Sequence, residues 1–370
     1  GGGAKPVGRQ FADDFDQLGI ETNKRVWNPF RRFEFWDPTL RGSSDSRERL
    51  WDAAAALLRG YRDSHSEADM AADVSILGTL HRTPYATESD RIADTLTQIF
   101  AGHDTTGNEL AWVLVELSRH PYTALELRRA LDEQNPGGRR PWTPLMLSRV
   151  TYLDHVISET FRLWPTAPIA IVRHADRDVT LGSGMVIPAG SDVMMPCFLQ
   201  HRTGVRNPDE WFPERWAGDQ LPQLQANQRP FGAGKRVCVG RNLANLELRY
   251  ATACIVQRFN MTLAAEPSPE HYITLKPTGG VVRFAPRDPS GSEEHPSTPD
   301  WAGGPFSFGQ ESPTRTVLPW LQFPDANSPA GTRGSSPAPR GGRGDSGAAS
   351  PRQSGSFSGR GSPLVAGRRA

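Results

Sequence analysis

Apolar residues fall three or four positions apart through most of the first 165 residues, which is the spacing of one helix face. This pattern predicts helices over residues 50–61, 67–80, 121–131 and 149–163. The first 20 residues show no such period. We therefore expect residues 1–23 to form an irregular N-terminal segment.

The longest helical pattern runs from residue 89 to residue 120 and is interrupted by AGHDTTG at residues 101–107. If that stretch stays helical, the element is about 30 residues and about 45 Å long. One interpretation is a helix boundary, where Gly102 ends a first helix and Thr106 and Glu109 form a capping box for a second. The other is a local opening of one helix, where Gly102 admits a flat ligand and a threonine hydroxyl beside a carboxylate relays protons.

Beyond residue 165 the period changes to two, which is the alternation of a β-strand. It predicts short strands over residues 169–172, 179–181, 185–187 and 193–195, a helix over 242–259, and a last hairpin around 276–280. Helices, a small antiparallel sheet and one further helix make an α+β fold that is mainly α.

Residues 27–36 combine aromatic and basic side chains. Such a segment could bind nucleic acid or lipid headgroups, but aromatic residues before a helix more often pack into a core. We therefore expect these aromatic side chains to be packed.

The charge balance excludes little by itself: 42 basic and 41 acidic residues leave a net charge of +1, which indicates neither a nucleic-acid nor a membrane partner. The three cysteines, Cys197, Cys238 and Cys254, include no CxxC pair, which argues against a disulfide framework or a zinc ribbon. So few cysteines indicate a reducing compartment.

The sequence contains no long apolar run, and its composition changes near the C-terminal end. No apolar run reaches the roughly 18–20 residues that cross a bilayer, so we expect no membrane span, and a chain that by itself is soluble and cytoplasmic. From residue 288 onward Pro, Gly, Ser and Arg dominate and hydrophobic periodicity is lost. Residues 288–370 are therefore predicted to be a disordered tail.

Cys238 stands in a glycine-rich loop, FGAGKRVCVG at residues 231–240, directly before a predicted helix. A helix N-terminus and neighbouring cations favour the thiolate form of cysteine, which is the form that binds metals. The glycines allow tight turns and let the loop lie flat against a planar partner. Taken alone, however, a single cysteine is more often a small buried apolar residue.

Glu159 and Arg162 stand three positions apart on one predicted helix, so they can pair or reach a common partner. Most such pairs are exposed and contribute less than about 1 kcal/mol. The flanking residues are apolar here, which favours a buried third partner, and Arg215 is the candidate.

Together these residues resemble the cytochrome P450 family. The loop matches the haem-binding signature FxxGxRxCxG at every fixed position, and AGHDTT at 101–106 is similar to the oxygen-activation motif. Glu159-x-x-Arg162 looks like the ExxR motif, and PERW at 213–216 looks like the PERF element. The motifs occur in the family's order over residues 89–284. The resemblance implies a P450-like helical fold with residues 24–287 as the C-terminal part of the domain, incomplete at the N-terminus because only 88 residues precede Ser89.

The resemblance also implies a role for each matching residue. Cys238 is the expected ligand of the iron of haem b (iron protoporphyrin IX), with Arg236 and Arg173 expected at its propionates. The other expected contacts of the haem are loop and helix positions: Phe231, Gly234, Gly240, Ala101 and Gly102. Asp104 and Thr105 are expected to deliver protons to dioxygen, and Glu159, Arg162 and Arg215 to form a structural triad.

The implied activity is a monooxygenase that hydroxylates an apolar small molecule, such as a fatty acid or other lipid, with dioxygen and electrons from an NADPH-dependent reductase. Lys235, Arg236, Arg241 and Arg249 would attract an acidic reductase to the cysteine loop. An anchored full-length form is expected on the cytosolic face of the endoplasmic reticulum membrane. One alternative is a catalytically impaired fragment with an interaction-type tail. Another is a reductase-independent isomerase or peroxygenase, against which the presence of Asp104 and Thr105 argues.

Overall fold

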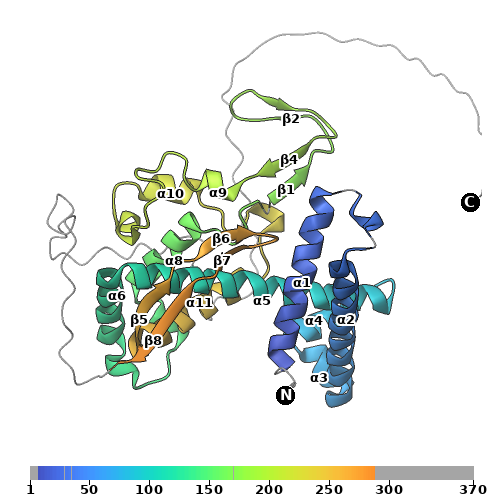
Figure 1. Ribbon diagram of the computed structural model, residues 1–370, viewed down its shortest axis with the longest axis horizontal. Coiled ribbons are helices and arrows are strands. Elements are labelled where there is room, and N and C mark those ends of the chain that lie inside the picture. Colours follow the sequence, from blue (N-terminus) through green and yellow to red (C-terminus); the bar gives the residue numbers. More distant parts are fainter. Residues whose placement is uncertain (1–6, 29, 35, 170, 288–370) are drawn as a thin grey trace, which may run out of the picture. The chain divides into compact units, whose positions relative to one another are not determined.

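Helices dominate the computed structural model, which describes residues 7–28, 30–34, 36–169 and 171–287 (Figure 1). Four helices precede the longest one: α1 (Val7–Trp27), α2 (Pro38–Ser64), α3 (Glu67–Ala72) and α4 (Ile76–Arg82). The remaining helices are α5 (Glu88–Arg119), α6 (Pro121–Gln134), α7 (Pro144–Leu147), α8 (Thr151–Leu163), α9 (Cys197–Gln200), α10 (Leu221–Asn227) and α11 (Arg241–Arg258). The expectation of a mainly helical fold is confirmed.

The strands form four antiparallel pairs. They are β1 (Ile171–His174) with β4 (Asp192–Met195), β2 (Val179–Thr180) with β3 (Val186–Ile187), β5 (Phe259–Ala265) with β8 (Val281–Pro286), and β6 (Ser268–His271) with β7 (Leu275–Thr278). The predicted strands after residue 165 are thus present. The predicted hairpin around residues 276–280 is wrong, because these residues connect β7 to β8, and β7 pairs with β6 whereas β8 pairs with β5.

Helix α5 continues without a break through residues 101–107, so the interpretation of a helix boundary at Thr106 is wrong. Its start is fixed by a capping box, in which Thr87 and Asp90 each accept a hydrogen bond from the other's backbone N–H. With 32 residues it is about 48 Å long. Figure 1 shows it running from beside α2 to α6, so one continuous helix contacts both of these elements.

The main core lies where α5, α6, α8 and α11 pack together. Its fully buried side chains come from all four helices: Val113, Leu127, Leu131, Leu153, Val156, Ile157, Leu248 and Val256. The apolar positions of α8 lie on a helix whose residues from Leu153 to Leu163 are all buried. The residues on α8 between these apolar positions are therefore also withdrawn from water.

The expectation of an irregular segment over residues 1–23 is wrong from residue 7 onward, because α1 covers Val7–Trp27. Phe11, Phe15 and Leu18 stand at helical spacing, but the stripe is narrow and is interrupted by Asp14. Asp14 is buried and accepts hydrogen bonds from Ser46 Oγ at 2.9 Å and from Arg49 Nε at 3.0 Å, both on α2. A charged residue therefore belongs to the packed face of α1.

The expected packing of the aromatic residues between α1 and α2 is also wrong for those whose side chains the structure describes. Phe30, Phe33 and Trp36 are 71%, 53% and 70% exposed. The buried residue of this segment is Arg31, which pairs with Glu21 at 2.8 Å and with two further carboxylates, those of Glu34 and Asp37, at 2.6 Å each. The side chain of Trp27 and all of Phe35 lie outside the described residues.

Two expectations concern the surroundings of the chain. No helix in the described part of the chain is long and apolar enough to cross a membrane. The predicted disordered tail, residues 288–370, lies outside the described residues.

Candidate functional site

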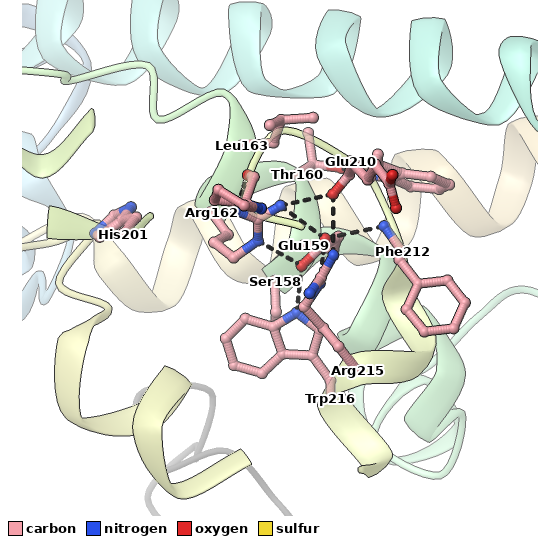
Figure 2. Close-up of polar contacts among 12 residues, drawn as sticks. Ser158, Glu159, Thr160, Arg162, Leu163, His201, Glu210, Phe212, Arg215 and Trp216 are labelled. Carbon is pink, nitrogen blue, oxygen red and sulfur yellow. Dashed lines mark hydrogen bonds and ion pairs between the residues drawn. The ribbon is translucent and has the colours of Figure 1, made fainter. Parts of the chain in front are cut away.

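Glu159 on α8 is fully buried and accepts five hydrogen bonds (Figure 2). Arg162 donates to both carboxylate oxygens, at 2.9 and 3.0 Å, and Arg215 Nε donates at 2.8 Å. Trp216 Nε1 and the backbone N–H of Phe212 each donate at 2.9 Å. The structure therefore brings the three residues of the predicted triad together and adds two donors, Trp216 and the N–H of Phe212, to which the sequence analysis assigned no role.

The two arginines also bind backbone carbonyl groups of the segment that follows α9. Arg162 donates to Pro208 O at 2.6 Å and to Glu210 O at 2.8 Å. Arg215 donates to Arg206 O at 2.8 Å, and also to the carbonyl of Glu210. Both charges are thus paired and hydrogen-bonded in a buried place, which is the condition under which buried ion pairs are tolerated. The result is a rigid platform between α8 and residues 206–216.

His201 fixes the start of the cysteine loop against α8. Its Nδ1 lies 3.1 Å from Phe161 O, and its Nε2 accepts the backbone N–H of Arg229 at 3.0 Å. These partners require a neutral ring with the proton on Nδ1. Burial lowers the pKa of His201 to about 4, which keeps the ring neutral. Gln228 adds a hydrogen bond from Nε2 to Ser158 O at 3.1 Å.

Acid should destabilise the fold through His201 and a second buried histidine, His155, whose pKa burial also lowers to about 4. Both folded values lie below the ordinary 6.5, so unfolding takes up protons, and the stabilising effect present above pH 6.5 is lost as the pH falls toward 4. Each histidine should contribute up to about 3 kcal/mol to this loss. Urea unfolding at pH 7, 5.5 and 4.5 measures it.

The matched control for this prediction is His174→Gln, because His174 is exposed on β1. That variant should keep the acid sensitivity of the parent chain, whereas His201→Gln should reduce it. Equal pH dependence of His201→Gln and the parent chain would contradict the assignment.

The cysteine loop itself is held by its aromatic start and its backbone. Phe231 packs edge-on against Phe161, with ring centroids 5.1 Å apart. The N–H of Cys238 donates to Phe231 O at 2.9 Å, which closes the loop. Gly234 has a φ of +71°, a left-handed conformation that a side chain would strain. The chain then enters α11 at Gly240, where a Cβ would lie 3.8 Å from Cys238 Sγ.

Cys238 is exposed, whereas Cys197 is buried and Cys254 is half-buried. The interpretation of Cys238 as a buried apolar residue is therefore wrong. Its sulfur lies at the N-terminal end of an 18-residue helix, where the helix dipole favours a negative charge. Among the described residues no group of three or more His, Cys, Asp or Glu side chains could hold a metal ion, so Cys238 belongs to no such cluster.

On α5, Ala101 and Gly102 are exposed, and a Cβ at Gly102 would meet no atom within 4 Å. The Thr105 hydroxyl donates to Ala101 O at 2.7 Å, one turn back along the helix. Asp104 is buried and lies 2.9 Å from Lys276 Nζ through Oδ1. Residues 101–107 are helical throughout, so α5 shows no local opening where one of the two interpretations placed it.

Asp104 also accepts a hydrogen bond at Oδ2 from Thr274 Oγ1 at 2.5 Å. Lys276 in turn lies 2.5 Å from Asp16 Oδ1 on α1. Burial opposes the charge of Lys276, but hydrogen bonds to Asp16 and Asp104 outweigh it and raise its pKa above the ordinary value. Thr274 and Lys276 come from the β6 and β7 region more than 160 residues later, and no motif in the sequence indicated them.

The two arginines expected at haem propionates are both exposed, Arg236 in a short 3-10 turn (Gly234–Arg236) and Arg173 on β1. Arg173 donates to the carbonyl of Val172 at 2.9 Å, and neither arginine has an ion pair with a carboxylate of the described residues. Arg249, by contrast, is buried and pairs with Asp154 at 2.7 Å, so it does not add to the surface charge around the loop.

These features fit a haem group. A haem needs an axial ligand for its iron, for which a cysteine thiolate is one of the usual choices, together with donors for two propionates and apolar surface around a flat ring. The chain has an exposed cysteine, two exposed arginines and an open glycine on a helix. It also exposes apolar side chains at Val172 and Val239. A cavity of about 540 Å³ borders the loop and is lined by Phe231, Gly234, Val237 and Arg241 among others, but Cys238 is not one of its lining residues.

The model of the family described as Cytochrome P450 matches residues 9–284 of this sequence. The chain belongs to the cytochrome P450 family. The matched range begins inside α1, so α1 is part of the P450 domain, and it includes the cysteine loop and every motif residue discussed above. Members of this family bind haem b.

Curated relatives include Cytochrome P450 734A5 of Oryza sativa subsp. japonica, 34% identical over 212 residues, which are 55% of this chain and 39% of the relative. The 25-hydroxyvitamin D-1 alpha hydroxylase, mitochondrial, of Rattus norvegicus is 38% identical over 170 residues, 44% of this chain and 33% of that protein. The chain thus spans about two fifths or less of these relatives.

Among solved structures, the crystal structure of a cytochrome P450 named CYP102L1 superimposes with a TM-score of 0.64 at 24% identity. The superposition covers 75% of this chain and 65% of that one. It shows the P450 fold, and it covers most of the part of the chain that the structure describes.

Proposed function

We propose that this chain is part of a haem-dependent monooxygenase that hydroxylates an apolar small molecule, using dioxygen and electrons from a reductase. The observation that carries the proposal is Cys238: it is exposed, it lies at the N-terminus of α11, and its loop is tied to the core through Phe231. Bound haem would supply the oxygen chemistry, with the thiolate ligand favouring O–O cleavage.

The chain's own residues hold the cofactor and manage protons. Cys238 would be the iron ligand, and Arg236 and Arg173 would bind the propionates. The platform around Glu159 holds α8, and α8 holds the cysteine loop through His201 and Gln228. The triad therefore acts on the loop's position and takes no part in the chemistry.

On α5, Thr105 would donate its hydroxyl proton to reacting oxygen. Asp104 would then supply a new proton to the Thr105 hydroxyl. Both groups are engaged elsewhere in this structure, Thr105 with Ala101 O and Asp104 with Lys276 and Thr274. Proton delivery therefore requires the hydroxyl to rotate away from Ala101 O. It also requires Asp104 to exchange a proton with Lys276 or with solvent.

Exposed positive charge at Lys235 supports docking of an acidic, NADPH-dependent reductase at the loop. Exposed apolar side chains at Ile169 and Val172 support an apolar substrate. A fatty acid or other lipid fits this surface, and one relative of the chain is itself named for acting on 25-hydroxyvitamin D.

The decisive test is the reduced, carbon-monoxide-bound difference spectrum of the chain produced with haem. Thiolate ligation has a characteristic band, and we expect it. A band typical of histidine or neutral-thiol ligation, or no haem uptake, would rule out the proposed function for this chain.

The proton-delivery role predicts the behaviour of Thr105→Ala. Haem binding and the carbon-monoxide spectrum should be unchanged, because the hydroxyl contacts only the helix backbone among the described residues. Product formation should fall about 100-fold, the lower range for loss of a proton donor, and the reducing equivalents should appear as hydrogen peroxide. Peroxide released per NADPH consumed measures this, with Thr106→Ala as the matched control. Unchanged coupling in Thr105→Ala would refute the role.

A further inference from the structure

Glu109 is a buried acid on α5 with a position that the motifs do not account for. It follows Thr105 by four residues and Gly102 by seven, so all three lie on one face of the helix. Its side chain is only 1% exposed. An acid therefore lies one turn beyond the proposed proton donor, on the face that carries the open glycine.

The surroundings of Glu109 differ from those of the other buried acids nearby. Neither of its carboxyl oxygens has a hydrogen-bond partner among the described residues. Glu159 accepts five hydrogen bonds, and Glu116, two turns further along α5, accepts from Arg119 and Trp164. Glu109 forms no ion pair within the described chain.

Among the described residues, Thr166 approaches the Glu109 carboxyl through its amide and hydroxyl, but without well-formed hydrogen bonds. Burial raises the pKa of Glu109 well above its ordinary value, and this effect outweighs the contacts with Thr166, which lower the pKa. An isolated buried carboxylate is costly, so the burial of Glu109 favours its protonated form. Asp104, in contrast, faces the ammonium of Lys276.

We propose that Glu109 is a neutral carboxylic acid that stores a proton for the site on α5, beside Thr105. This inference rests on the proposed monooxygenase function. Hydroxylation with dioxygen consumes two protons and two electrons from the reductase, and it forms the alcohol and one water. Glu109 would release its O–H proton toward the Thr105 side of the helix, become a carboxylate, and recover a proton from solvent. Glu109 is thus a positioning residue that acts through Thr105.

The first test needs neither haem nor turnover. In the infrared difference spectrum between the parent chain and Glu109→Gln at neutral pH, the C=O band of a protonated carboxylic acid should be present in the parent and lost in the variant. Thr106→Ser, on the same stretch of α5, should keep the band. Absence of the band from the parent chain at neutral pH would overturn the proposal.

The second test uses the pH dependence of unfolding. A folded pKa above the unfolded value means that the stabilisation is complete below about pH 4.5 and is lost as the pH rises toward the folded pKa. Between pH 5 and pH 8, the urea midpoint of unfolding of Glu109→Gln should therefore rise relative to that of the parent chain. Glu109→Leu serves the same comparison if the glutamine variant does not fold. A constant difference across this range would count against the proposal.

The last test uses the haem-loaded chain. Glu109→Gln should keep the thiolate carbon-monoxide band and should release several-fold more peroxide per NADPH than the parent chain, with an altered pH profile of product formation. If the thiolate carbon-monoxide band is absent in the parent chain, the proposed monooxygenase function fails, whatever the infrared spectrum shows. If the carbon-monoxide band is present and Glu109→Gln releases no more peroxide per NADPH than the parent chain, only the proposed role of Glu109 fails.

Discussion

Replacing Glu159 by alanine should leave most of the chain unfolded at room temperature. The change removes a carboxylate that accepts five hydrogen bonds and leaves the guanidinium groups of Arg162 and Arg215 buried without their counter-charge. Breaking one buried pair costs about 3–5 kcal/mol, and two arginines depend on this one carboxylate. Whole domains are stable by only about 5–15 kcal/mol, so the loss takes up much of the total.

Circular dichroism and urea unfolding test this expectation. The matched control is Asp209→Ala, which removes an ion pair with Arg202 at 3.0 Å in which Asp209 is 84% exposed. That pair should contribute less than about 1 kcal/mol. A Glu159→Ala chain that unfolds within 1 kcal/mol of the parent chain would show that the platform does not hold the fold.

Replacing Cys238 by alanine should abolish haem binding and leave the fold intact. The sulfur is exposed, and among the described residues the contacts that hold the loop are made by backbone groups and by Phe231. Removing the side chain therefore takes away the proposed iron ligand with little loss of packing. The haem-to-protein ratio after purification should fall to background, while the urea midpoint of the haem-free chains stays within experimental error.

Cys254→Ala is the control for this variant, because Cys254 is half-buried on the same helix and packs against the main core. It should bind haem in full, at a stability cost of about 1 kcal/mol for a partly buried small side chain. Full haem incorporation by Cys238→Ala, with an unchanged carbon-monoxide spectrum, would show that another residue is the ligand.

Much of the helical part could be predicted from apolar spacing, because α5, α6 and α8 each bury a stripe wide enough to be visible in the sequence. Helix α1 escaped detection for a physical reason. Its packed face includes Asp14 and Glu21, whose charges are balanced by Arg49 on α2 and by Arg31 in the connection. A pattern of apolar residues alone cannot reveal a buried helix face that includes charged residues, because their ion-pair partners lie in other segments of the chain.

The candidate site also contains some features that the sequence predicted and others that it did not. The triad was indicated by short-range spacing, three positions between Glu159 and Arg162, and the structure brings Arg215 to it as expected. The contact between Asp104 and Lys276 spans 172 positions in the sequence, and Glu109 shows nothing unusual until its burial is known. Long-range pairing and missing partners are properties of the folded chain, and local spacing does not contain them.

The platform around Glu159 has a consequence for the order in which the chain can mature during synthesis. Arg162 follows Glu159 by three residues, but the last partner, Trp216, follows it by 57. At about 5–20 residues per second, roughly 3–11 s pass on the ribosome before that donor is made. During this interval α8 exists with one of its two arginines and cannot bury Glu159 in full. The cysteine loop is synthesised after Trp216, so the platform that supports it is completed only shortly before the loop is made.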